Sequence, residues 1–149
     1  MKNIICFDID DSLLPYVPGG YDYKYFELNF RFLINIAIKT NSYLYMISSW
    51  ASMYILVNGK LKLKKVEYND ELIENITNII NKYSENRLID ISKQPNRRKK
   101  IIDLLKEGNK IIAIDDINLN DIVHPNYLFI KTIGKIDKER IKQIEQFFS

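Results

Sequence analysis

A run of acidic residues and a serine follows the first apolar stretch of the chain. After residues 3–7 come Asp8, Asp10, Asp11 and Ser12. Neighbouring carboxylates repel one another unless a cation or a shared proton offsets their charge. Mg²⁺ is the usual cation where carboxylate oxygens meet a phosphate. The segment therefore indicates chemistry on phosphate, although an acidic turn after a strand is the alternative, because Asp and Ser are common in turns.

Two further polar groups follow apolar stretches of the same kind. Ser48 and Ser49 come after one such stretch, and Asp115 and Asp116 come after another. If these stretches are parallel strands of one sheet, their carboxyl ends lie at the same edge, which is where ligands of such sheets bind. We therefore expect the three polar groups to converge on one site.

The elements that would position these groups alternate along the chain. Strand-like apolar runs cover residues 3–7, 43–47, 87–91, 110–114 and 127–131. Helical periodicity covers residues 25–39, 70–83, 95–107 and 136–148. This alternation predicts a single α/β domain over residues 1–149, with right-handed crossovers. The expected architecture has three layers and is Rossmann-like, with a central, mostly parallel sheet.

Local signals mark several of the expected ends and turns. Pro95 suits the first turn of a helix, and Gly108 suits the C-terminal cap of the same helix. Asp137 is a candidate N-cap for the last helix. The dipeptide Asn58-Gly59 is typical of a hairpin turn.

Composition and charge limit the class of protein. The 149 residues suit one compact domain, and 46% hydrophobic with 28% charged residues are typical of a globular protein. No apolar run approaches the roughly 20 residues of a membrane span. The acidic residues near the N-terminus come too early for a secretory signal. We therefore expect a cytoplasmic protein without a membrane partner.

The scarcity of histidine and cysteine excludes several kinds of site. His124 is the only histidine, so a Cys/His zinc site and a Ser-His-Asp triad are disfavoured. Cys6 has no partner for a disulfide and is most simply a small core residue. Gly19-Gly20 lacks the lysine and hydroxyl residue of a phosphate-cradling loop, which disfavours a kinase built on that loop.

The acidic and hydroxyl residues, in this order, resemble the motifs of the haloacid dehalogenase-like (HAD-like) superfamily of phosphohydrolases. Its first motif is an apolar strand followed by Asp-x-Asp-x-Thr or a close variant. Its second is a Ser or Thr that ends the next strand, and its fourth is an acidic pair that ends a later strand. The matching residues here are Asp8, Asp10, Ser12, Ser48, Asp115 and Asp116. Ser12 replaces the threonine and keeps the hydroxyl group.

The resemblance implies a two-step mechanism and a cofactor. Asp8 would attack phosphorus to give an aspartyl-phosphate, which water then hydrolyses. Asp10 would protonate the leaving oxygen and later activate the water. The cofactor would be Mg²⁺, held by Asp8, Asp115 and the backbone carbonyl of Asp10. Asp116 would be a further ligand or would lie just behind the ligands.

The resemblance also implies groups that bind the phosphate. Ser48 would donate a hydrogen bond to a phosphate oxygen, with Ser49 and Ser12 as further substrate-binding residues. Ser48 is at the same time an ordinary N-cap candidate for a helix that begins near Trp50. The two roles of Ser48 are compatible.

The third motif of the superfamily, a lysine that neutralises the phosphate and the nucleophile, has three candidates. Lys99 ranks first, as a catalytic residue, because of its distance from the acidic pair. Lys93 and Lys100 follow as substrate-binding residues. Helix phase does not choose between them, so all three stay open.

The substrate prediction depends on the space and charge around the site. In the superfamily, cap domains that cover the site are inserted at two usual points, and neither point has room for a large cap domain in this chain. The site would then be an open cleft, which can admit a polynucleotide end or a phosphoprotein. Basic clusters at 97–100 and 60–65 can bind phosphate backbones. Ser48-Ser49-Trp50 is similar to the small HAD-like domains of RNA-repair proteins. We expect a Mg²⁺-dependent phosphatase of nucleic-acid ends or nucleotides. A phosphatase of a phosphoprotein or small metabolite, or a non-catalytic binding module, is the alternative.

Overall fold

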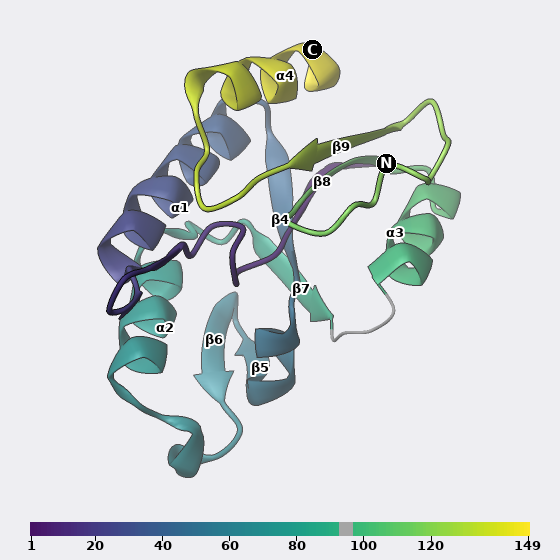
Figure 1. Ribbon diagram of the computed structural model, residues 1–149. Helices are drawn as coiled ribbons and strands as arrows, with labels where there is room; N and C mark the ends of the chain where they lie inside the picture. Colours follow the sequence, from purple (N-terminus) through teal and green to yellow (C-terminus); the bar gives the residue numbers. More distant parts are fainter. Residues whose placement is uncertain (93–96) are drawn as a thin grey trace.

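A five-stranded parallel sheet forms the centre of the described chain (Figure 1). In the computed structural model, which describes residues 1–92 and 97–149, its strands are β1 (Asn3–Phe7), β4 (Ser42–Ile47), β7 (Leu88–Ser92), β8 (Lys110–Asp115) and β9 (Tyr127–Lys131). Their order is β7-β4-β1-β8-β9, and all neighbouring pairs are parallel. The strands predicted from the apolar runs are confirmed, with ends that differ by at most one residue.

The strand order places a topological switch point between β1 and β8. From β1 the chain builds outward through β4 to β7, and it then returns to the other side of β1 to form β8 and β9. In folds of this topology, ligands bind outside the carboxyl ends of the strands that flank the switch point. The fold is a Rossmann-like α/β fold, as the alternation of strands and helices predicts.

Within the described ranges, four α-helices cover the two faces of the sheet and give three layers (Figure 1). α1 (Tyr23–Lys39), α2 (Glu71–Tyr83) and α4 (Lys138–Phe148) pack on one face, and α3 (Arg97–Lys106) packs on the other. The four predicted helices are confirmed, except that the predicted start of α3, including Pro95, lies outside the described residues. None of the described helices is both long and apolar enough to cross a membrane.

Side-chain caps set the beginnings of the outer helices. Asp22 accepts hydrogen bonds from the N–H groups of the first turn of α1, so this helix begins two residues earlier than the apolar pattern predicts. Asp137 accepts from the N–H of Arg140 and is the N-cap of α4, as predicted. Gly108 follows α3 with φ +89°, a left-handed conformation that suits the predicted C-terminal cap.

The sheet separates two apolar cores, which is why β1 is buried on both faces. The larger core lies under α1, α2 and α4. In it the ring of Phe30 lies 5.7 Å from that of Phe26 and 6.0 Å from that of Phe7. The smaller core lies under α3 and includes Ile101 and, as expected, Cys6. Burial of each large apolar side chain stabilises the folded state by about 1.5–3 kcal/mol. Because apolar cores lie on both faces of β1, its carboxyl end is held in place from both sides.

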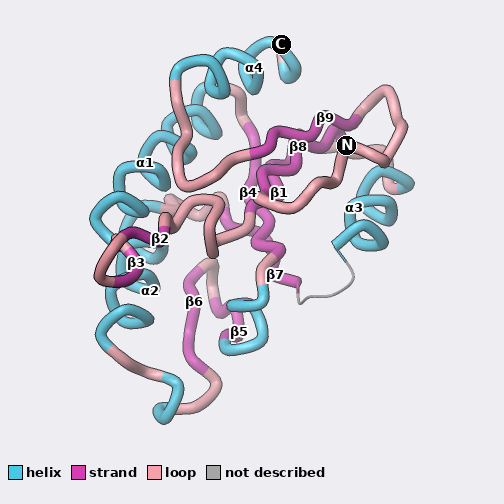
Figure 2. Tube along the Cα trace, viewed as in Figure 1, coloured by secondary structure: helices cyan, strands magenta, loops and turns pink. Residues whose placement is uncertain are grey.

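Two short hairpins follow the carboxyl ends of β1 and β4 (Figure 2). β5 (Tyr54–Val57) and β6 (Lys60–Leu63) are joined by Asn58 (φ 51°) and Gly59 (φ 76°), the left-handed pair that the Asn-Gly turn predicts. β2 (Tyr16–Val17) and β3 (Gly20–Tyr21) form a smaller hairpin in the loop after β1, which we did not predict from sequence. Both insertions are two-stranded.

Candidate functional site

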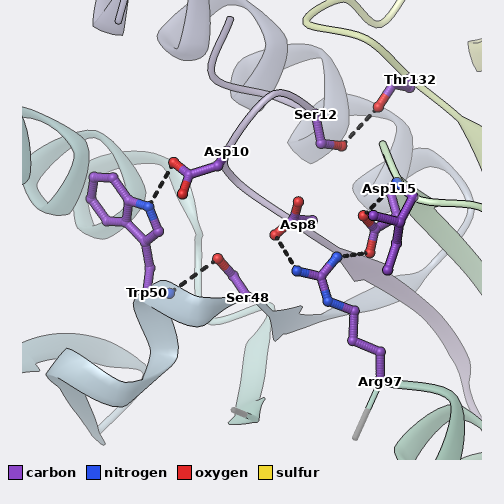
Figure 3. Close-up of polar contacts among 9 residues, drawn as sticks. Asp8, Asp10, Ser12, Ser48, Trp50, Arg97, Asp115 and Thr132 are labelled. Carbon is purple, nitrogen blue, oxygen red and sulfur yellow. Dashed lines mark hydrogen bonds and ion pairs between the residues drawn. The ribbon is translucent and has the colours of Figure 1, made fainter. Parts of the chain in front are cut away.

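Three acidic residues at the ends of β1 and β8 form one cluster at the switch point, and Figure 3 shows two of them, Asp8 and Asp115. Asp8 follows β1, Asp115 ends β8 and Asp116 comes next. One carboxylate oxygen from each lies within 4.8 Å of those of the other two. The strand register is the reason: Phe7 pairs with Ile114, so Asp8 and Asp115 occupy the next level of the same parallel pair. The structure thus brings together the strand ends that we expected to converge.

Arg97, the first residue of α3, supplies the positive charge in this cluster (Figure 3). Its Nη1 donates to Oδ2 of Asp115, and its Nη2 lies 3.4 Å from Oδ1 of Asp8. The side chain of Arg97 is 10% exposed and that of Asp8 is 3% exposed. Because water is largely excluded, these charges interact more strongly than a surface ion pair. Arg97 was not among the predicted site residues, because the motif calls for a lysine at this place.

Of the three lysines expected near the phosphate, two are described, and neither contacts the cluster. Lys93 lies outside the described residues. Lys99 is exposed, and the ammonium of Lys100 lies 5.5 Å from the ring centroid of Tyr45. Both lysines lie in the first turn of α3, like Arg97, but a helix has about 3.6 residues per turn, so successive side chains point in different directions around its axis and that of Lys99 points away from that of Arg97. The position of Arg97, soon after a predicted strand and early in the next helix, was the signal that could have identified it.

Asp10 lies on the loop after β1 and is held by Trp50 (Figure 3). The indole Nε1 of Trp50 donates to Oδ1 of Asp10 at 2.8 Å, and Trp50 is 7% exposed. Burial raises the pKa of Asp10, and the hydrogen bond from Trp50 acts in the opposite direction. One carboxylate oxygen of Asp10 is therefore fixed. Asp10 was a predicted site residue, whereas its hydrogen-bond partner Trp50 was not predicted.

Ser48 occupies the position after β4, the strand beside β1, and is fully buried. Its Oγ accepts a hydrogen bond from the N–H of Trp50 at 3.2 Å and caps the short 3₁₀ helix η1 (Ser49–Met53). The predicted capping role is confirmed, with a 3₁₀ helix in place of a longer one. Ser49, which we also expected to bind substrate, is exposed.

Ser12, which we expected to bind substrate, anchors the loop after β1. Its Oγ shares a hydrogen bond with Oγ1 of Thr132 at 2.7 Å, and both residues are fully buried (Figure 3). Its carbonyl accepts from the N–H of Gly134 at 3.0 Å. The hydroxyl group that resembled the family motif is therefore engaged with the segment after β9.

Asn29, on α1, fixes the same loop from another side. Its Nδ2 donates to the carbonyls of Leu13 at 2.8 Å and Gly134 at 3.1 Å, and its Oδ1 accepts from the N–H of Ile136 at 3.0 Å. Asn29 is 1% exposed. Since buried backbone groups need partners, this one side chain joins the loop that carries Asp10 to the segment after β9.

No protein-family model, curated protein or solved structure matches the chain. A fold of this kind supports many activities, so the function must be inferred from the site itself.

The charges of the cluster favour a divalent cation. Burial, and then repulsion from Asp115, raise the pKa of Asp8 to about 8, while Arg97 acts in the opposite direction. Burial also raises the pKa of Asp115, again against the effect of Arg97. Among the described residues, Arg97 is the one cation that ion pairs place on Asp8 and Asp115, and Asp116 adds a third carboxylate. With this balance the cluster needs further positive charge to ionise fully. Its donors are all hard carboxylate oxygens, which suit Mg²⁺ or a similar ion.

Proposed function

We propose that this chain is a metal-dependent phosphomonoesterase of the HAD-like type that works through an aspartyl-phosphate on Asp8. The observation that carries the proposal is the cluster at the switch point, where oxygens of Asp8, Asp115 and Asp116 lie within 4.8 Å of one another. The order of these residues along the chain adds support, because the superfamily motifs come in the same order.

Mg²⁺ is the proposed cofactor. Asp8, Asp115 and the backbone carbonyl of Asp10 would hold it, with Asp116 beside them. When bound, the ion would supply positive charge that offsets the repulsion between the nucleophile and an anionic phosphate. The excess negative charge of the buried cluster, which raises the pKa of Asp8 and of Asp115, supports a site that takes up a cation.

Asp8 and Asp10 divide the chemistry between them. A carboxylate oxygen of Asp8 forms a bond to phosphorus as the ester oxygen leaves, and Asp10 gives that oxygen its proton. In the second step Asp10 takes a proton from water, and the water oxygen attacks phosphorus. Inorganic phosphate leaves, and Asp8 is regenerated. The hydrogen bond from Trp50 fixes one oxygen of Asp10 and leaves the other for the proton.

Arg97 takes the role in this proposal that the sequence assigned to a lysine. Its guanidinium is already in contact with Asp8, whereas the described lysines of α3 are exposed or lie over Tyr45. Ser48 remains a proposed donor to a phosphate oxygen. Its hydroxyl accepts from the N–H of Trp50, so its own proton is available for donation.

The proposed substrate carries a terminal phosphate, with nucleic-acid ends and nucleotides ranked first. The hairpins after β1 and β4 are short, which supports an open site able to admit a large substrate. Lys60 and Lys62 are exposed on β6. Exposed Tyr16 and Tyr21, whose rings meet edge to face at 5.2 Å, add aromatic surface of the kind on which bases stack. A phosphoprotein or a small phosphomonoester is the alternative substrate.

Release of inorganic phosphate from a panel of phosphomonoesters tests the proposal. The panel contains oligonucleotides with 3′- and 5′-phosphates, free nucleotides, sugar phosphates and a phosphopeptide, each with and without Mg²⁺. Asp8→Asn is expected to lower the rate by at least about 1,000-fold, because it removes the nucleophile. Asp121→Asn is the matched control, since Asp121 is exposed and paired with Arg98. A wild-type chain that hydrolyses no member of the panel contradicts the proposal.

A non-catalytic binding module is the rival, and one observation favours it. Arg97 already offsets part of the charge of Asp8 and Asp115, so the cluster has a counter-charge without any metal. The same panel separates the two functions, because a module would bind a phosphorylated partner and release no phosphate.

A further inference from the structure

We propose that Arg97 is an exchangeable counter-cation: a divalent metal displaces it from Asp115, and the freed guanidinium then binds the phosphate. Metal and phosphate would therefore bind cooperatively. The inference rests on the proposed metal-dependent function and adds to it a coupling between the two ligands.

The first observation is that each oxygen of Asp115 already accepts a hydrogen bond, and that the one on Oδ2 comes from Arg97. Oδ1 accepts from the N–H of Ile117 at 3.2 Å, and Oδ2 accepts from Nη1 of Arg97. A metal that this carboxylate ligates through Oδ2 has to share that oxygen with the guanidinium or replace it. Two positive groups on one oxygen repel each other strongly in a buried site. Replacement is therefore the favoured outcome.

The second observation is that Arg97 has unused donors although it is buried. A guanidinium carries five N–H donors. Among the described residues, Arg97 makes one hydrogen bond, to Asp115, and its buried Nε has no partner. The approach of Nη2 to Asp8 is an ion pair at 3.4 Å. Because buried donors without partners are unfavourable, this side chain has donors to give to another acceptor.

A phosphate matches those donors. Its oxygens accept parallel hydrogen bonds from a guanidinium in the bidentate arrangement that arginine favours. In the proposed reaction the phosphorus lies next to Asp8, which Arg97 already contacts. Once released from Asp115, the guanidinium needs only a short movement to reach the phosphate oxygens.

Displacement has a measurable thermodynamic consequence. Without metal, Arg97 is occupied by the carboxylates and binds phosphate weakly. With metal, it is free to bind phosphate. Linkage requires that phosphate tighten metal binding by the same factor. Simple attraction between metal and phosphate would also give coupling, but that part would not depend on Arg97.

Calorimetric titration of Mg²⁺ into the purified chain, with and without inorganic phosphate, tests the inference. In the wild type, phosphate is expected to tighten metal binding at least about fivefold. In Arg97→Gln the metal alone should bind more tightly, because its competitor is gone, and the effect of phosphate should fall to less than about half of that in the wild type, leaving only the direct attraction between metal and phosphate. Arg98→Gln is the matched control. It makes the same charge change one residue away, where the guanidinium is paired with exposed Asp121 at 2.9 Å.

Each outcome decides between the alternatives. The inference is overturned if Arg97→Gln weakens metal binding or keeps the wild-type coupling, or if Arg98→Gln loses the coupling equally. Should Arg97→Gln fail to fold, Arg97→Lys takes its place, because a single ammonium gives no bidentate contact and should lower the coupling. The titrations need no turnover, so an inactive chain that shows the coupling contradicts only the proposed phosphatase. A wild type that binds no metal contradicts both proposals.

Discussion

At the scale of single residues, the site depends on two side chains to which the motif pattern assigns no role in the chemistry. Arg97 offsets the charge of Asp8 and Asp115, and Trp50 holds Asp10. Both come from elements that are distant in sequence from the first acidic residues. A motif identifies groups that do chemistry, whereas the partners that orient them depend on packing.

Trp50→Phe is expected to lower the rate of phosphate release by about 10- to 100-fold, because a hydrogen bond to a carboxylate contributes about 1.5–3 kcal/mol. The loss should also raise the pKa of Asp10, since the hydrogen bond from Trp50 favours the ionised form. The rate of the step that needs ionised Asp10 as a base should therefore rise at a higher pH than in the wild type. Steady-state kinetics across pH measure both effects.

Tyr54→Phe is the control for this variant. It removes a hydroxyl that shares a hydrogen bond with Thr77 at 2.6 Å and does not contact Asp10. The pH profile of this control should match that of the wild type. An equal shift in both variants would mean that the effect of Trp50 is only structural.

At the scale of elements, the loop after β1 is positioned by α1 and by the segment after β9. Asn29 reaches both sides, and Gly134 comes so close that a Cβ at this position would lie 2.7 Å from Cβ of Pro15. Gly134 also has φ +78°, which other residues rarely adopt. The loop that carries Asp10 is thus part of the packed structure.

Asn29→Leu is expected to reduce the free energy of unfolding by about 3 kcal/mol or more, because it leaves three buried backbone groups without their partner. Asn35→Leu, an exposed position on the same helix, should change it by less than about 0.5 kcal/mol. Chemical denaturation of the two variants measures the difference. Equal effects would show that the buried hydrogen bonds of Asn29 contribute little.

At the scale of the whole molecule, the pairing of β1 with β8 brings like charges together. Asp8 comes from the half built on β1, and Asp115 comes from the half built on β8. The two apolar cores hold these halves in register, so the carboxylates meet although they repel. Part of the stability supplied by the cores therefore offsets the charge of the site, which is common where a fold supports a function.

The effect of the Asp8 charge on the free energy of unfolding should depend on pH. In the folded, metal-free chain Asp8 keeps its proton up to about pH 8, whereas in the unfolded chain it loses the proton near pH 4. Between these values the folded state binds more protons, so stability falls as the pH rises, by up to about 1.4 kcal/mol per pH unit. Below about pH 4 this loss is absent.

Thermal or chemical denaturation at several pH values, compared between the wild type and Asp8→Asn, isolates this effect. The stability of the wild type relative to the variant should decrease from about pH 4 to about pH 8. Added Mg²⁺ should reverse the trend in the wild type, because a metal binds the ionised carboxylates. A relative stability that stays constant or rises with pH would contradict the expected pKa shift.

The strands, the helices and the convergence of Asp8 with Asp115 could all be predicted from the order of residues along the chain. Apolar periodicity is a local property, and a parallel sheet places every strand end of one kind at one edge. Three contacts could not be predicted in this way: the ion pairs of Arg97, the hydrogen bond from Trp50 to Asp10, and the hydrogen bond by which Ser12 anchors its loop. Such contacts depend on strand register and helix position. Those are set by the packing of many residues at once, so no local pattern reveals them.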